Sequence, residues 1–314
     1  MHLEVVVLAA GRGIRMRSRL PKVLHTLAGQ PLIRHVLGMA KQLNPHKIHV
    51  VVGHESDAVK MSCTDLSVNW VEQLEQLGTG HAVLQAMPHV SLDSQVLVLY
   101  GDVPLLTRPT IDKLIDNAGN GTAVLTAKLS DPTGYGRVVR DSLGGFSQIV
   151  EHKDATEDEL SINEVNTGVL VVPASHLDAY LPHVTTANSQ AEYYLPDILS
   201  HLVEANEKVA LVDALPEEIL GINDRLQLAV AERMLRTSRA RKLMESGATL
   251  IDPSRVDIRG EVECGEDVVV DVNVIFQGKV TLGDGVWVGA NSYISNSTVG
   301  AHTIVHPMTI LDGA

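Results

Sequence analysis

The sequence predicts an α/β protein with a mostly parallel, mixed sheet, followed by a short β-helix of hexapeptide repeats. Up to about residue 130, apolar β-rich runs alternate with helix-like stretches, which is typical of βαβ units. In residues 262–314, apolar residues recur instead at every sixth position, the period of hexapeptide β-helices. Only 3% of the residues are aromatic, so Val, Leu, Ile and Ala must form the core, which suits parallel strands and solenoids.

The predicted elements alternate regularly in the first part of the chain. Strands are expected at residues 3–9, 47–52, 67–71 and 95–100, and helices at 32–43, 55–61, 80–87 and 110–118. A parallel sheet of this kind binds ligands beyond the carboxyl ends of its strands. Residues 122–173 carry longer β segments with turn signals, which predict a mixed extension of the sheet with hairpins over the ligand site.

Three further elements lead from the sheet to the repeats: a helix at 192–206, a strand at 209–214 and a long helix at 224–247, capped by Asp224 and Gly247. Two columns of residues six apart are then expected to point into the β-helix: Val262, Val268, Val274, Val280, Val286 and Ser292, and Cys264, Val270, Phe276, Leu282, Val288 and Ile294. After Ile294 the register slips by one residue and the column resumes at Val299, Val305 and Leu311. A β-sandwich is the alternative, but it would show a period of two.

Composition excludes several classes of protein. With 45% hydrophobic and 20% charged residues the chain is neither disordered nor collagenous, and its formal charge of −13 argues against nucleic acid or an anionic membrane as partner. No apolar run approaches the roughly 18 residues of a membrane span and no basic region precedes the first apolar stretch, so we expect a cytoplasmic protein. Cys63 and Cys264 show no metal-ligand or disulfide spacing, and both are expected to be buried thiols.

A basic cluster stands out against this acidic background. Five basic residues and no acidic one lie directly after a glycine turn, which indicates a small polyanion such as a nucleotide: Arg12, Arg15, Arg17, Arg19 and Lys22. The turn itself, with Gly11 and Gly13, is neither the dinucleotide fingerprint nor a P-loop. The alternatives are a tight strand-to-helix turn and a solvated basic face.

Three more features suggest a nucleotide site. Lys22 follows the stiffening Pro21 and can act as a point charge on a phosphate, unless it is a plain surface lysine. Residues 76–81 form a loop that enters a helix, and its amides suit base or ribose recognition, although a simple helix start would have the same sequence. Asp102 comes directly after an apolar strand and is placed to hold a divalent cation against a triphosphate, with a surface aspartate as the alternative.

Eight segments in order resemble the bacterial bifunctional N-acetylglucosamine-1-phosphate uridyltransferase/glucosamine-1-phosphate acetyltransferase family, and the resemblance covers essentially the whole chain. They are residues 8–16, 21–25, 75–81, 100–104, 131–137, 149–153, 164–168 and 221–225. The resemblance implies a Rossmann-like nucleotidyltransferase domain followed by a left-handed β-helix. It implies three parts: a uridyltransferase domain at 1–225, a linker helix at 226–250 and β-helix coils at 251–314.

The resemblance also implies roles for single residues. Catalysis would rest on Arg15, Lys22 and Asp102, and Mg²⁺ would bind Asp102 and Asn223. Substrates would be bound by a larger set: Leu8, Ala9, Ala10, Gly11 and Lys22 at the nucleotide, Gln73, Gly78 and Thr79 at uracil, Tyr100, Gly101 and Asp102 between the two ligands, Asn223 at the metal, and Gly136, Glu151 and Asn166 at the sugar. The implied reaction converts UTP and N-acetylglucosamine 1-phosphate into UDP-N-acetylglucosamine and pyrophosphate, for peptidoglycan and lipopolysaccharide synthesis.

The sequence departs from the family pattern in two ways. Ile14 stands where the family usually has a small hydroxyl residue, so one hydroxyl contact to phosphate is missing. The later coils and the tail that build the family's acetyltransferase site and its homotrimer are not among these 314 residues, so we expect no acetyltransferase activity and a monomer or weak oligomer. Two alternatives stay open: a related nucleotidyltransferase with another sugar or base, and a non-catalytic scaffold protein.

Overall fold

The computed structural model describes residues 2–11, 13–53 and 56–314, which form two compact units. The N-terminal unit comprises the residues up to His25 together with Leu32–Asp224, and the C-terminal unit comprises Thr26–Pro31 and Arg225–Ala314. The predicted Arg12 and the predicted helix start at Glu55 lie outside the described residues. Within the described ranges, no helix has the length and hydropathy that crossing a bilayer requires.

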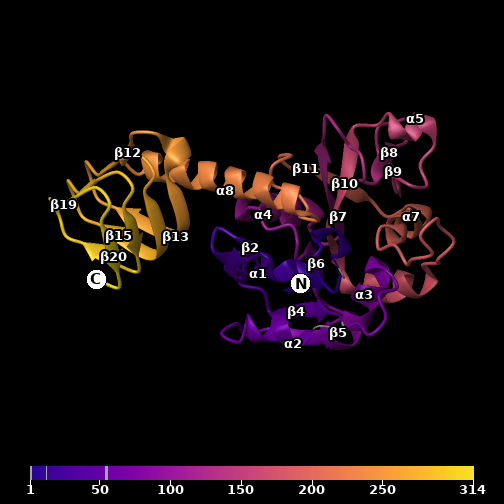
Figure 1. Cartoon of the computed structure of the whole chain (residues 1–314). Helices are drawn as coiled ribbons and strands as arrows, with labels where there is room; N and C mark the ends of the chain where they lie inside the picture. The colour runs from indigo at the N-terminus through magenta and orange to yellow at the C-terminus, as the bar shows by residue number, and fades with distance from the viewer. Residues whose placement is uncertain (1, 12, 54–55) are drawn as a thin grey trace. The chain divides into compact units, whose positions relative to one another are not determined.

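A nine-stranded mixed sheet forms the centre of the N-terminal unit as far as the structure describes it (Figure 1). Its path runs β11-β7-β10-β6-β1-β4-β5, and β8 and β9 form a hairpin beside β10. The strands are β1 (Leu3–Ala9), β4 (Lys47–Val52), β5 (Asn69–Glu72), β6 (Gln95–Tyr100), β7 (Thr122–Lys128), β8 (Arg137–Arg140), β9 (Phe146–Val150), β10 (Glu164–Pro173) and β11 (Val209–Asp213). β10 is antiparallel to β6 and β7, whereas β6, β1, β4 and β5 are parallel.

Helices cover both faces of this sheet. They are α1 (Leu32–Gln42), α2 (Ser56–Met61), α3 (Thr79–Ala86), α4 (Arg108–Ala118), α5 (Glu157–Leu160), α6 (Ala174–Tyr180) and α7 (Asp197–Glu204). On β1, Val5 and Val7 belong to a core with α1, α2 and α4, whereas Val6 belongs to a second core with α3, α6 and α7. Because both faces are buried, the strand is apolar at nearly every position rather than at alternate ones.

The predicted α/β fold is confirmed, and so are nearly all of its elements to within two residues. The hairpin extension after residue 122 is also confirmed. The helix predicted to start at residue 192 begins instead at Asp197. The physical reason is that the Tyr193 N–H donates to the Leu77 carbonyl at 2.8 Å, which holds this segment as a loop against residues 77–80.

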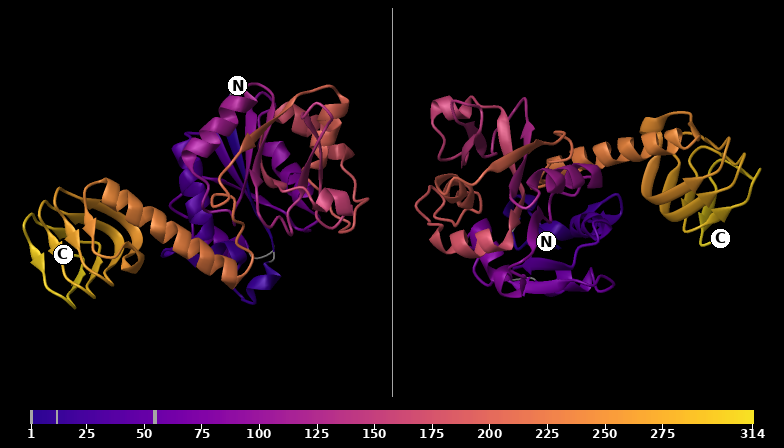
Figure 2. Two further views of the ribbon diagram at one scale, coloured as in Figure 1. Left: turned by 90° about the horizontal axis from the view of Figure 1, so that it is seen from above. Right: turned by 180° about the vertical axis from the view of Figure 1, so that it is seen from behind.

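The C-terminal unit consists of a long helix and stacked parallel coils (Figures 1 and 2). Its elements are β2 (Thr26–Leu27), β3 (Gln30–Pro31), α8 (Arg225–Glu245), β12 (Thr249–Leu250), β13 (Asp257–Cys264), β14 (Val269–Val270), β15 (Ile275–Leu282), β16 (Trp287–Val288), β17 (Tyr293–Ser295), β18 (Thr298–Val299), β19 (Ile304–Val305) and β20 (Ile310–Asp312). Paired residues lie 18 positions apart at Ile275↔Tyr293 and 17 apart at Tyr293↔Ile310. Three hexads therefore make one coil, and the slip of one residue is confirmed.

Both inward columns are buried as predicted over most of their length. Cys63 is a buried free thiol as expected, but the prediction for Cys264 is wrong, since this thiol is only half-buried, 3.2 Å from the Ser246 hydroxyl. The cause is that β13 is an edge strand of its sheet, so Val262 and Cys264 have a neighbouring coil on one side only. The α8 helix ends before Gly247, whose φ of +106° marks the glycine that the sequence predicted there.

Candidate active site

Two loops of the N-terminal unit meet at the carboxyl edge of the sheet because β1 and β6 are parallel neighbours. The Gly101 N–H donates to the Leu8 carbonyl at 2.9 Å, which joins the loop after β6 to the end of β1. A Cβ at Gly101 would lie 3.3 Å from the Ala9 Cβ and 3.2 Å from a Val23 methyl, so a larger residue would push the two loops apart. Leu8 and Ala9 are buried strand residues, Ala10 is half-buried and Gly11 is exposed.

The glycine turn packs directly on Lys22. Gly13 has a φ of +59°, and a Cβ there would come within 2.5 Å of the Lys22 Cβ. Only glycine satisfies both the backbone conformation and this close approach. Ile14 and Arg15 lie on the short 3₁₀ helix Ile14–Met16, where both are exposed and the Ile14 side chain is 81% accessible. The bulky Ile14 therefore costs this loop no packing.

Three polar side chains converge beside the turn: Lys22, Asp102 and Asn223. The Lys22 ammonium forms an ion pair with Asp102 Oδ2 and donates to Asn223 Oδ1 at 3.1 Å. The side chains of Lys22 and Asp102 are 13% and 14% exposed, so this ion pair is shielded from water. The Ile222 N–H donates to the Asp102 carbonyl at 2.9 Å, which brings the Asn223 segment to the end of β6.

The donor set of Asp102 and Asn223 fits a magnesium ion. Both side chains present an oxygen to a single cationic nitrogen, so the two oxygens already converge on one point. A carboxylate and an amide oxygen are hard ligands of the kind that Mg²⁺ takes, with waters and substrate phosphates completing the octahedron. The sequence alone suggested a metal role for Asp102 only, because Asn223 is 121 positions further along the chain.

The segment implied to bind uracil is held in place by several close contacts. Gln73 is buried, and its amide donates to the Gly78 carbonyl at 3.2 Å. Gly78 has a φ of +115°, and a Cβ there would lie 2.5 Å from the Tyr193 carbonyl oxygen. Thr79 accepts a hydrogen bond from the Leu195 N–H at 3.0 Å. Tyr193 and Leu195 thus hold the loop from across the unit, a contribution that no motif indicated.

The residues implied to bind the sugar lie together around Gly136. A Cβ at Gly136 would be 3.0 Å from Glu151 Oε1, and the Gly136 carbonyl accepts from the Asn166 N–H at 2.8 Å. Gly168, with a φ of +81°, lies against the Tyr100 ring, where a Cβ would be 2.6 Å from a ring carbon. Tyr100 also hydrogen-bonds Thr79, so its side chain links the segments that are implied to bind the sugar and uracil.

Buried charge shapes this part of the site. Burial raises the pKa of Glu151 above its ordinary value, and the nearby carboxylates of Asp197 and Asp154 raise it further. The pKa of Tyr100 is also raised, mainly by burial and then by Glu151 and Asp102. Burial likewise raises the pKa of Asp197. The buried carboxyl oxygens of this region are hydrogen-bond acceptors, which suits a polyhydroxylated ligand.

Comparisons with known proteins identify an NTP transferase domain and several relatives of the whole chain. A family model described as a MobA-like NTP transferase domain matches residues 5–248. Bifunctional protein GlmU of Marinobacter nauticus is 48% identical over 314 residues, covering 99% of this chain and 69% of that protein. The GlmU proteins of Cupriavidus taiwanensis and Stutzerimonas stutzeri are also 48% identical, covering 99% and 100% of this chain.

The chain belongs to the GlmU family. It spans about 69% of the length of these GlmU relatives. The resemblance found in the sequence is thereby confirmed, and the chain is a nucleotidyltransferase enzyme of the GlmU family. Which residues bind substrate or metal stays a prediction.

Solved structures of other nucleotidyltransferases share the fold. A nucleotidyl transferase from Methanothermobacter matches with a TM-score of 0.53 at 21% identity, covering 75% of this chain and 99% of its own. The inositol-1-phosphate CTP transferase from T. maritima matches with a TM-score of 0.56 at 19% identity, covering 71% of this chain and 90% of its own. These likenesses establish the nucleotidyltransferase fold of the N-terminal unit.

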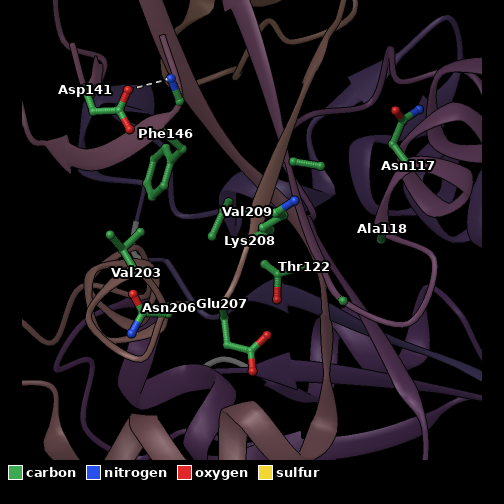
Figure 3. A pocket seen from close by; sticks show the side chains of 13 residues that line it. Asn117, Ala118, Thr122, Asp141, Phe146, Val203, Asn206, Glu207, Lys208 and Val209 are labelled. Atoms are coloured by element: carbon green, nitrogen blue, oxygen red, sulfur yellow. Dashed lines mark hydrogen bonds between the residues drawn. The ribbon is translucent and has the colours of Figure 1, made fainter. Parts of the chain in front are cut away.

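A separate cavity of about 740 Å³ lies away from the GlmU candidate site (Figure 3). Thr122 and Val209 line it at the amino ends of β7 and β11, together with Phe146 of the hairpin. None of the predicted site residues is among its lining residues. This cavity therefore lies apart from the polar groups that converge at the carboxyl edge, where we predict the site of this GlmU relative.

Proposed function

We propose that the N-terminal unit transfers UMP from UTP to N-acetylglucosamine 1-phosphate, giving UDP-N-acetylglucosamine and pyrophosphate. The observation that carries the proposal is the convergence of Lys22, Asp102 and Asn223 at the carboxyl edge of β1 and β6. Tyr100 supports it further, because it connects the base-side Thr79 with the sugar-side Gly168 at the same edge. The product would serve peptidoglycan and lipopolysaccharide synthesis in the cytoplasm.

The chemistry requires positioning and charge rather than a general base. A phosphate oxygen of the sugar phosphate, already anionic at neutral pH, attacks the α-phosphorus of UTP. The bond from the α-phosphorus to the oxygen that bridges the α- and β-phosphates breaks, and pyrophosphate leaves with that electron pair. Lys22 and Arg15 would stabilise the charge that builds on the α-phosphate and the leaving group.

Different segments of the site would bind different parts of the two substrates. The backbone of Leu8, Ala9, Ala10 and Gly11 would cradle the nucleotide, while Gln73, Gly78 and Thr79 would bind uracil. The sugar would be bound by Gly136, Glu151 and Asn166, with Gly101 between the two ligands. When held by Asp102 and Asn223, Mg²⁺ would neutralise charge on the phosphates and bring the two reactants together.

A panel of substrates tests the proposal. Pyrophosphate release with Mg²⁺ should be much faster for UTP and N-acetylglucosamine 1-phosphate than for dTTP, or for UTP with glucose 1-phosphate. A faster rate with glucose 1-phosphate would favour a related sugar nucleotidyltransferase. If no substrate pair released pyrophosphate, a non-catalytic homologue would be favoured. The expectations of weak association and of no acetyltransferase activity in the 314-residue polypeptide stay predictions, which light scattering and a thiol-release assay with acetyl-CoA would test.

A further inference from the structure

A cluster of histidines and one carboxylate lies at the amino edge of the sheet, at the opposite end of β1 from the candidate active site. One ligand atom each from His2, Glu4 and His46 lies within 4.8 Å of the other two. His46 directly precedes β4, the parallel neighbour of β1, and its N–H donates to the Leu3 carbonyl at 2.7 Å. Strands rise about 3.3 Å per residue, so roughly 23 Å separate His2 from Ala9 at the other end of β1.

The carboxylate of Glu4 is unusual because it is fully buried in a central strand, with 0% exposure. One of its oxygens accepts a hydrogen bond from His49 Nε2 at 2.8 Å, and His49 is also fully buried. The other oxygen, Oε1, lies 3.4 Å from His2 Nε2. Neither Glu4 Oε1 nor His2 Nε2 has a hydrogen-bond partner among the described residues. Two buried polar atoms therefore face each other without a hydrogen bond to satisfy either of them.

His49 holds the carboxylate in this orientation. The Asn69 amide lies 3.0 Å from His49 Nδ1, and as a donor there it leaves the ring proton on Nε2, which then donates to Glu4. Neighbours that orient a metal ligand through a hydrogen bond of this kind are a regular part of metal sites. Glu4 Oε1 is thus fixed toward His2 rather than free to rotate away.

We propose that His2, Glu4 and His46 bind a zinc ion, with His49 positioning the carboxylate. Tetrahedral zinc holds nitrogen and oxygen ligands at about 2.0–2.1 Å, which places ligand atoms roughly 3.3 Å apart. The 3.4 Å between His2 Nε2 and Glu4 Oε1 already matches this spacing. His46 is exposed, so its side chain can move to complete the set, and the fourth position is left for water.

The ligand chemistry separates this site from the magnesium pair. Two imidazoles and one carboxylate favour zinc, whereas Mg²⁺ takes oxygen ligands and sheds its water reluctantly. A zinc ion here would tie the start of β1 to the start of β4 and would stabilise the N-terminal unit without entering the reaction. The competing interpretation is a purely hydrogen-bonded network between Glu4 and His49 with no metal.

Zinc binding is tested with tag-free protein, because a histidine tag would compete. Equilibrium dialysis against ZnCl₂ in millimolar Mg²⁺, followed by elemental analysis, should find one zinc per chain that Mg²⁺ does not displace. His2→Gln and His46→Gln should each weaken binding tenfold or more, whereas His183→Gln, which removes an exposed histidine elsewhere, should not. Cobalt substitution should give the visible absorption of a four-coordinate site in the wild type and in His183→Gln, but not in His2→Gln or His46→Gln.

Measurements of melting temperature and of activity distinguish a loss of zinc binding from a failure of the variants to fold. Zinc should raise the melting temperature of the wild type and of His183→Gln but not of His46→Gln, since a ligand that binds only the folded state stabilises it. Pyrophosphate release should be the same in all these variants. The zinc site is refuted if tag-free protein takes up no stoichiometric zinc at about ten micromolar, or if the double variant of His2 and His46 still binds it equally well.

Discussion

The carboxyl edge of the N-terminal sheet and the coils of the C-terminal unit are built in different ways. In the coils, each inward residue pairs with a residue 17 or 18 positions away, as Phe276 does with Ile294. At the sheet edge, Lys22 meets partners 80 and 201 positions away in the chain. Each coil repeats the same packing of inward apolar residues. The sheet edge, in contrast, is assembled from segments that share no sequence pattern. Substitutions in the coils should therefore change stability, and substitutions at the edge should change chemistry.

The largest effect on stability is expected in the coils. Phe276 is 0% exposed, so Phe276→Ala should lower the free energy of unfolding of the C-terminal unit by about 3–5 kcal/mol through the cavity it leaves. Denaturant unfolding in a Trp70→Phe background, monitored at Trp287 in the coils, measures this loss. Ile310→Ala, at a 74% exposed position, is the matched control. A fall in kcat along with stability would contradict the separation of the two regions.

At the sheet edge the largest expected effect is on turnover. Asp102→Asn keeps the shape of the side chain but removes the charge paired with Lys22 and proposed to hold Mg²⁺. We expect kcat to fall about a hundredfold or more, with the fold intact. Steady-state pyrophosphate release across a Mg²⁺ titration checks this. Asp116→Asn, at an exposed position, is the control, and unchanged turnover of Asp102→Asn at saturating Mg²⁺ would show that Asp102 has no metal role.

Two glycines with similar positive φ values allow a direct comparison of the two regions. Gly78 and Gly247 have φ values of +115° and +106°, but only at Gly78 would a Cβ clash, at 2.5 Å from the Tyr193 oxygen. Gly247→Ala should cost only the backbone strain of about 1 kcal/mol, and Gly78→Ala up to about 3 kcal/mol. Thermal unfolding and the KM for UTP measure both. A raised KM is expected for Gly78→Ala alone. Equal effects of the two variants would contradict a role for the close contact between Gly78 and Tyr193.

Glu151 should show opposite effects on function and stability. Burial, Asp197 and Asp154 raise its pKa, with Tyr100 and Tyr194 as further neighbours, so the folded state holds the proton more tightly than the unfolded chain. The stability linked to that proton is full below the unfolded pKa and is lost as pH rises through the folded pKa. Glu151→Gln should therefore raise the melting temperature at pH 8 but hardly at pH 4.

The functional half of this prediction is a rise of about tenfold in the KM for the sugar phosphate, because an ionised acceptor is lost. Asp197→Asn is the control, since its pKa is also raised by burial but no sugar contact is predicted for it. If Glu151→Gln left the KM unchanged, Glu151 would have no part in binding the sugar.

The smallest expected effect is at Ile14. Its side chain is 81% exposed, so Ile14→Thr should alter packing little and restore a hydroxyl near the phosphates. One recovered hydrogen bond would contribute about 1 kcal/mol of transition-state binding, roughly a fivefold gain in kcat/KM. Ile14→Val, which adds no hydroxyl, is the control. Equal rates for the two variants would mean that the loop has adapted to isoleucine.

The coils were predictable almost residue by residue, down to the slip after Ile294. A column of equal apolar residues is visible in sequence because every coil repeats the same environment. The half-buried Cys264 was missed for the same reason, since the repeat does not reveal which coil lies at the edge. The parallel strands were also predictable from the sequence, because burial on both faces makes each strand a continuous apolar run.

By itself, the sequence determined the α/β and solenoid fold, the glycine turn before Lys22 and the carboxylate after β6, all of which depend on local pattern. Only the tertiary structure decided that Lys22 contacts both Asp102 and Asn223, and that the Tyr193 backbone packs closely against Gly78. It also decided that Glu4 is buried against His49 and His2. These contacts join residues from different strands and loops, so they follow from how the sheet is ordered and not from any spacing along the chain.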